Sequence, residues 1–118
     1  MKILIGDDSI LARKQLRDCI TSLTDDVEFI EGANGREAVA LYKQESPAMA
    51  FLDIVMPVED GVTALKEILA YDKKAIVVIV SSVGTQAELK EAIEAGAKDF
   101  IQKPIKTEQI ENVIRNYL

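Results

Sequence analysis

At 118 residues, the chain is long enough for one domain that buries about two-thirds of its unfolded surface and folds without a disulfide or metal. Its net charge of −6 offers no basic footprint for nucleic acid, and the absence of histidine excludes a Ser-His-Asp or Cys-His centre and a histidine zinc site. The single cysteine, Cys19, lies on an apolar helix face and is expected in the core, and no signal-like or membrane-length apolar segment occurs. We therefore expect a reduced, cytoplasmic domain that neither enters a membrane nor binds nucleic acid directly.

The first part of the chain alternates apolar runs with amphipathic segments. Residues 2–5 predict a strand, and apolar residues at helical spacing over 12–23 predict a helix. The partly alternating run 27–31 is typical of an edge strand. Asn34-Gly-Arg-Glu37 has the spacing of a capping box, for a helix that ends near Ser46-Pro47.

The middle of the chain contains the most apolar segments. Residues 49–52 are apolar on both sides of the pleat, which predicts a buried central strand with Asp53 at its end. A helix with an apolar face over 62–69 follows and stops near residues 72–74. Residues 75–80 are apolar and mostly β-branched, which predicts a second buried strand.

The last part repeats the pattern once more. Thr85-Gln-Ala-Glu88 is a second capping box, for a helix that ends at Gly96. Residues 99–102 predict a short, half-polar strand that ends at Lys103-Pro104. From about Thr107, a final helix has a core-facing stripe that reaches Leu118.

This alternation predicts an α/β fold: a doubly wound, five-stranded parallel sheet with right-handed crossovers and helices on both faces. The two continuous apolar runs suit the centre of the sheet and the mixed runs suit its edges. The strand order 2-1-3-4-5 fits this distribution best. It is matched to the known flavodoxin-like topology rather than worked out from the residues.

Polar and charged residues follow four of the five predicted strands. They are Asp7 and Asp8 after the first strand, Asp53 after the third, Ser81 after the fourth and Lys103 after the last. Because the carboxyl ends of parallel strands open onto one crevice, we expect these side chains to meet there.

Each of these residues also has a plainer interpretation. The Asp7-Asp8-Ser9 stretch can cap the next helix, Ser81 can cap a turn, and Lys103 can lie on the surface. Asp53 stands too far before Gly61 to cap the helix that begins there. Caps have no reason to occupy the ends of the central strands together, so the joint placement favours a site.

Three neighbouring carboxylates repel one another unless a counter-charge is present. A hard divalent cation with oxygen ligands satisfies this need, Mg²⁺ before Ca²⁺. With Lys103 included, the charges then sum to about zero, and the site can accept an anion. A phosphoryl group on Asp53 adds negative charge and acceptor oxygens, which Mg²⁺, Lys103 and the Ser81 hydroxyl can hold, so Asp53 is the expected nucleophile.

The chain resembles the receiver domain of two-component response regulators along its whole length, residues 1–118. The motifs that carry the likeness are Asp7-Asp8, Asp53, Met56-Pro57, Asp60-Gly61, Ser81 and Lys103-Pro104. Its length is most similar to the single-domain chemotaxis regulators, the CheY-like proteins. The resemblance implies a phospho-accepting regulator rather than an enzyme, in which Asp53 takes a phosphoryl group from the phosphohistidine of a sensor kinase.

The resemblance also implies the metal ligands. Asp8, Asp53 and the backbone carbonyl of Val55 would bind Mg²⁺, and Asp7 would help through water. Val55 and Val83 would flank the phosphoryl group. Because neither valine can orient a hydrolytic water by hydrogen bonding, we expect phospho-Asp53 to hydrolyse slowly.

A switch is implied as well. Ser81 and Lys103 would contact the phosphoryl oxygens, and the Lys103–Pro104 bond would be cis, which only an X-Pro peptide forms cheaply. Movement of Ser81 would let Phe100 rotate and remodel the face of the fourth helix, last strand and last helix, where a downstream target docks. Relatives commonly carry Thr and Tyr at these positions, so Ser81 lacks a methyl group and Phe100 lacks a hydroxyl.

Three alternatives stay open. A flavin- or nucleotide-binding module would need a phosphate cradle after the first strand, where this chain has two acids. An aspartyl-phosphate phosphatase would need a second acid near Asp53, and Ile54-Val55 supplies none. The domain is also compatible with a receiver that belongs to a longer regulator with an output domain.

Overall fold

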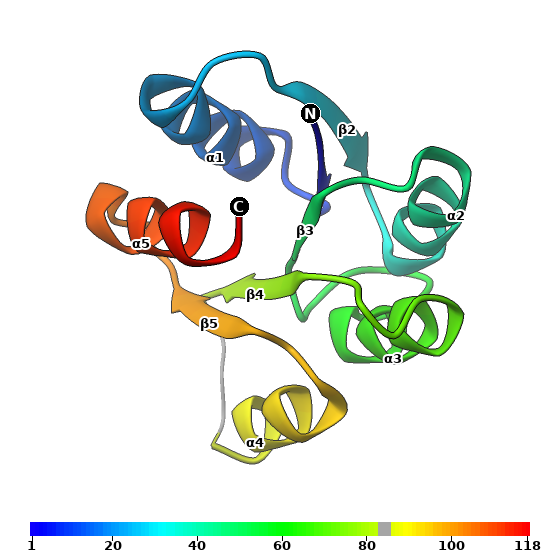
Figure 1. Cartoon of the computed structure of the whole chain (residues 1–118). Coiled ribbons are helices and arrows are strands. Elements are labelled where there is room, and N and C mark those ends of the chain that lie inside the picture. The colour runs from blue at the N-terminus through cyan, green and yellow to red at the C-terminus, as the bar shows by residue number, and fades with distance from the viewer. Residues whose placement is uncertain (83–85) are drawn as a thin grey trace.

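The fold was analysed in a computed structural model, which describes residues 1–82 and 86–118. Strands and helices alternate in the order β1 Lys2–Gly6, α1 Ile10–Leu23, β2 Glu28–Gly32, α2 Gly35–Glu45, β3 Met49–Leu52, α3 Gly61–Tyr71, β4 Val77–Ser81, α4 Gln86–Ala95, β5 Asp99–Gln102 and α5 Thr107–Tyr117. The strands form one parallel sheet in the order β2-β1-β3-β4-β5 (Figure 1). The predicted fold class and strand order are thus confirmed.

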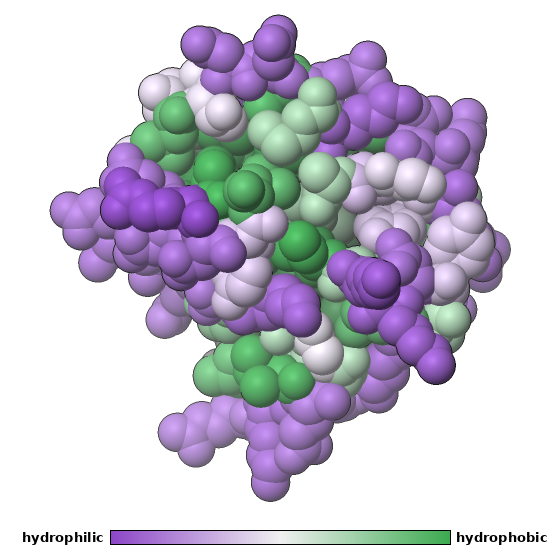
Figure 2. All heavy atoms as spheres, viewed as in Figure 1, coloured by the Kyte–Doolittle hydropathy of each residue, from purple (hydrophilic) through white to green (hydrophobic). Residues whose placement is uncertain are grey.

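Helices cover both faces of the sheet. α1 and α5 pack together on one face, whereas α2, α3 and α4 follow one another over the other (Figure 1). Figure 2 shows hydrophilic side chains around the rim of this view and apolar side chains toward its middle, where the helices meet the sheet. In the described part of the chain, no helix has the length and apolarity needed to cross a bilayer.

The central strand β3 explains the two-layer core. Its four residues are all buried and alternate between the faces: Met49 and Phe51 join the layer of α1 and α5, and Ala50 and Leu52 join the layer of α2, α3 and α4. Burying one large aliphatic or aromatic side chain is worth about 1.5–3 kcal/mol. A strand that contributes to both layers is held in the middle of the sheet, and Asp53 is therefore held at its end.

Side-chain caps begin three of the helices, α1 at Ser9, α2 at Asn34 and α3 at Asp60. The Asn34 side chain accepts a hydrogen bond from the Glu37 amide at 2.8 Å, and the Glu37 carboxylate accepts one from the Ala33 amide at 2.8 Å. The reciprocal bond thus reaches one residue further back than in the standard capping box. Asp60 caps α3, which leaves Asp53 free of that role. The predicted capping residue Thr85 lies outside the described residues.

Three local expectations differ from the structure. β4 begins at Val77 rather than Ala75, because the Ala75 amide closes a turn on the Asp72 carbonyl. Cys19 is only partly buried against the α1 and α5 layer. Leu118 was expected on the core-facing stripe of the last helix, but it follows the helix end and is 45% exposed.

Candidate functional site

Three carboxylates meet at the carboxyl ends of β1 and β3. One oxygen from each of Asp7, Asp8 and Asp53 lies within 4.8 Å of the others. Asp7 and Asp53 are 5% and 8% exposed, because they continue two of the inner strands, β1 and β3, and Asp8 is exposed. The Asp53 amide donates to the Gly6 carbonyl at 2.9 Å, so the strand pairing extends to the acidic residue itself.

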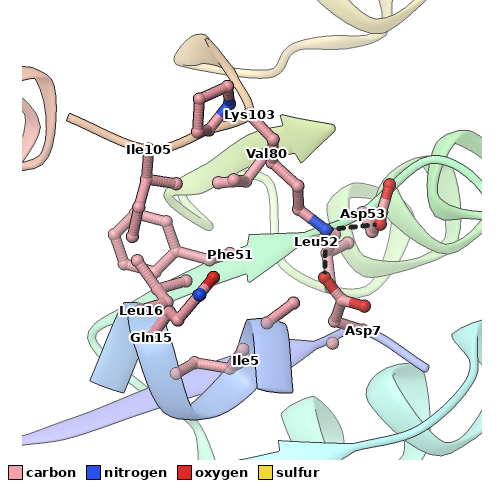
Figure 3. A pocket seen from close by; sticks show the side chains of 13 residues that line it. Ile5, Asp7, Gln15, Leu16, Phe51, Leu52, Asp53, Val80, Lys103 and Ile105 are labelled. Atoms are coloured by element: carbon pink, nitrogen blue, oxygen red, sulfur yellow. Dashed lines mark hydrogen bonds and ion pairs between the residues drawn. The ribbon is translucent and has the colours of Figure 1, made fainter. Parts of the chain in front are cut away.

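Lys103 reaches this cluster from the end of β5. Its Nζ lies 2.6 Å from Asp7 Oδ2 and 2.9 Å from Asp53 Oδ2 (Figure 3). Burial by itself would lower the pKa of Lys103, but its hydrogen bonds to both carboxylates and their charges outweigh burial and raise the pKa. The ammonium therefore stays charged at neutral pH, and its contribution to stability is lost only as the pH rises through this raised pKa.

Lys103 is one of the residues that line a small, largely apolar cavity of about 50 Å³ on the α1 and α5 side of the sheet. Leu16, Phe51, Val80 and Ile105 are among the residues that line it (Figure 3). The apolar side chains of this lining offer no hydrogen-bond acceptor to the Lys103 ammonium, so its hydrogen bonds are directed to the carboxylates of Asp7 and Asp53.

Ser81 and Val55 are two further residues that the sequence predicted beside Asp53. Ser81 is buried at the end of β4, and its backbone carbonyl accepts a hydrogen bond from the Lys103 amide at 2.9 Å. The Val55 amide donates to Asp53 Oδ1 at 3.3 Å, while the Val55 side chain is 57% exposed. Val83, the other residue expected beside the phosphoryl group, lies outside the described residues.

Phe100 lies in β5, the edge strand that ends just before Lys103. Its ring is partly buried against the layer of α2, α3 and α4. The Lys103–Pro104 peptide bond at the end of the same strand is cis.

Two residues that sequence reasoning did not assign to the site contact Asp7. The Ser9 amide donates to Asp7 Oδ1 at 2.9 Å, and Arg13 Nη1 donates to the Asp7 backbone carbonyl at 2.6 Å. Ser9, which also caps α1, was visible in the sequence as a candidate cap. Arg13 carried no sequence signal, because its role depends on where its long side chain folds back.

The donor set suits a hard divalent cation. The clustered ligand atoms are all carboxylate oxygens, two of them on buried residues, and one ammonium only partly balances three negative charges. No sulfur or imidazole of the described residues joins the group, so it does not match the ligands of a structural zinc site. Magnesium therefore fits the chemistry of these residues.

A doubly wound α/β domain with acids at its central strand ends and a lysine hydrogen-bonded to two of them has the architecture and the site expected of a phospho-accepting signalling domain. The profile of the response regulator receiver domain matches residues 3–115, and the chain belongs to this family. Members of the family act as signalling switches rather than as classical enzymes.

Several relatives are similar over nearly their whole length. The chain is 43% identical over 109 residues to the chemotaxis protein CheY of Thermotoga maritima, covering 92% of this chain and 90% of the relative. It is 40% identical over 117 residues to CheY of Bacillus subtilis, covering 99% and 97%. Among solved structures, the CheX–CheY–BeF₃–Mg²⁺ complex of Borrelia burgdorferi has a chain that matches with a TM-score of 0.91 at 35% identity, covering 98% of this chain and 87% of that one.

Proposed function

We propose that the chain is a chemotaxis-type response regulator whose Asp53 accepts a phosphoryl group from the phosphohistidine of a sensor kinase. The observation that carries this proposal is the burial of Asp53 beside a second buried acid, with one ammonium hydrogen-bonded to both. The high identity to CheY proteins supports the chemotaxis assignment.

Mg²⁺ is the cofactor in this proposal. Asp8, Asp53 and the Val55 carbonyl would hold the ion, and Asp7 would act through water. The oxygen-only donor set supports this, as does the description of the Borrelia CheY neighbour as a complex with BeF₃ and Mg²⁺. When bound, the ion supplies positive charge that offsets repulsion between the acids and an incoming phosphoryl group.

The chain's own residues then perform the transfer. An Asp53 carboxylate oxygen attacks phosphorus, and the phosphorus–nitrogen bond of the donor breaks with its electron pair returning to the imidazole. Lys103, which already donates to Asp53, would turn to the oxygens of the new phosphoryl group. Ser81, at the end of β4, would supply a hydroxyl to the same oxygens.

Phosphorylation would be read out through Ser81 and Phe100. Phe100 lies in β5, so its rotation would alter the face made by α4, β5 and α5, where a downstream target would bind. Reversing a 1:99 equilibrium takes about 5.5 kcal/mol, whereas one new hydrogen bond supplies about 1 kcal/mol. The contacts of Mg²⁺ and Lys103 must therefore contribute to the switch along with Ser81.

We propose further that residues 1–118 act as a single receiver domain in the cytoplasm. The given residues match 90% and 97% of the length of two CheY relatives, so they correspond to nearly the whole of those proteins. A receiver within a longer regulator is the alternative.

Acetyl phosphate and Mg²⁺ provide a direct test without a kinase. Intact-mass spectrometry of the treated protein is expected to show one added phosphoryl group. Asp53→Asn should abolish this gain, whereas the exposed Asp25→Asn should leave it unchanged. A gain that persists in Asp53→Asn would place the acceptor elsewhere, and steady release of phosphate from p-nitrophenyl phosphate would favour a phosphatase instead.

A further inference from the structure

The three acids of the site are held in different ways. The carboxylates of Asp7 and Asp53 are both fixed by Lys103, and Asp7 also accepts the Ser9 amide. Within the described residues, the exposed Asp8 carboxylate makes no hydrogen bond or ion pair. The direction in which Asp8 points is therefore set mainly by the backbone that leads into it.

That backbone is held from both sides. The Asp7 amide donates to the Gly32 carbonyl of β2 at 3.0 Å, and the Asp7 carbonyl accepts Arg13 Nη1 at 2.6 Å. The Asp7 carbonyl and the Asp8 amide belong to one planar peptide group. A bond that fixes the carbonyl thus fixes the plane from which the Asp8 side chain emerges.

Arg13 is itself well anchored. Its side chain is 16% exposed, and its Nε lies 3.1 Å from Glu31 Oε1 on β2. The other Glu31 oxygen accepts Arg17 Nη1 at 2.6 Å, so the carboxylate cannot swing away freely. Because a guanidinium is planar and rigid, its bond to Glu31 also orients the nitrogen that donates to Asp7.

We propose that Arg13 is a positioning residue for the metal site, acting by clamping the Asp7–Asp8 peptide so that the Asp8 carboxylate faces Asp53. The inference rests on the Mg²⁺ site of the proposed function. Groups that orient metal ligands typically account for about 10–100-fold in affinity. We expect replacement of Arg13 to lower the Mg²⁺ affinity about tenfold. This is the lower end of that range, because Arg13 acts through the backbone.

The sign of the effect separates positioning from simple electrostatics. Arg13→Gln removes a positive charge near an acidic site, and charge alone would strengthen the binding of a cation. Loss of the clamp weakens binding instead. Lys14→Gln is the matched control, because it removes one positive charge from the same helix, where Lys14 pairs with Asp18 and contacts neither Asp7 nor Glu31.

Mg²⁺ binding is measured by calorimetric titration, at a temperature at which circular dichroism shows every variant folded. Arg13→Gln should weaken binding about tenfold, and Lys14→Gln should change it less than twofold. Arg13→Lys serves as a second variant, because an ammonium cannot hold Glu31 and the Asp7 carbonyl in the same fork, and it should also weaken binding. Affinity of Arg13→Gln and Arg13→Lys within twofold of the parent, or tighter, would overturn the inference.

A double-mutant cycle tests the route through Asp8. Asp8→Asn should weaken Mg²⁺ binding, which is measured by NMR titration to high Mg²⁺ concentration. Adding Arg13→Gln to Asp8→Asn should then lower the Mg²⁺ affinity by less than a further twofold. An undiminished tenfold loss in the Asp8→Asn background would show that Arg13 acts by another route. If Asp8→Asn binds Mg²⁺ as tightly as the parent, the proposed metal site itself fails, which distinguishes the two proposals.

Discussion

Val55 is an apolar residue next to a carboxylate that is proposed to carry a phosphoryl group. Its amide contacts Asp53 Oδ1, but its exposed isopropyl group offers nothing to a water molecule that approaches Asp53. We therefore expect the lifetime of the phosphorylated state to depend on this side chain, although it takes no part in forming that state.

Replacing Val55 by Asn together with Val83 by Glu is expected to shorten that lifetime by at least about tenfold, since a positioned proton acceptor contributes roughly 10²–10⁴-fold. The measurement is a time course of phosphate loss in Mg²⁺ after removal of the phosphodonor. Val58→Asn is the control, because Val58 is an exposed valine of the same loop. An unchanged lifetime in the double variant would refute the explanation.

At the scale of elements, the position of Asp53 depends on how closely α3 packs against the end of β3. The Gly61 amide, at the start of α3, donates to the Ile54 carbonyl at 2.8 Å. A Cβ at Gly61 would overlap the Asp53 backbone carbonyl, which has no flexible end that can move aside. Glycine is thus required here by close approach of two backbones.

Gly61→Ala should force α3 away from β3 and cost about 1–3 kcal/mol of unfolding free energy, the usual range for overpacking. Urea denaturation followed by circular dichroism measures this, and acetyl phosphate labelling should slow in parallel as Asp53 shifts. Thr63→Ala, at an exposed position in the first turn of the same helix, should stay within about 0.5 kcal/mol of the parent. Parent-like stability of Gly61→Ala would show that the backbone adjusts without cost.

At the scale of the whole molecule, one sheet joins two hydrophobic layers. Ile68 of α3 lies in one layer and Ile110 of α5 lies in the other, and both are fully buried. β3 places alternate residues in the two layers, so loosening one layer disturbs the strand on which the other layer also packs. The domain should therefore unfold in one cooperative transition.

Ile68→Ala and Ile110→Ala should each lower the unfolding free energy by about 2–5 kcal/mol, the range for large-to-small changes in a core. Each variant should also keep a single transition. Far-ultraviolet circular dichroism and tyrosine fluorescence in urea should give coincident curves. Two separated transitions in either variant would mean that the layers unfold independently.

Much of the architecture was accessible from residue patterns. The two-sided apolar run of β3 predicted its central position, and the placement of Asp7, Asp53 and Lys103 after their strands predicted a shared crevice. These inferences worked because the alternation of side chains along a strand and the common direction of parallel strands follow from backbone geometry alone. The strand order also needed comparison with a known topology.

The chain order of apolar and acidic residues determined by itself that a sheet would gather carboxylates and one ammonium at a single edge. Only the tertiary structure decided how that edge is held: Arg13 folds back onto the Asp7 carbonyl, Gly61 meets the Asp53 backbone, and Leu118 is left exposed. Periodicity reports which face a residue occupies. It carries no information on the rotamer of a long side chain or on the distance between two backbones, because packing between distant elements sets both.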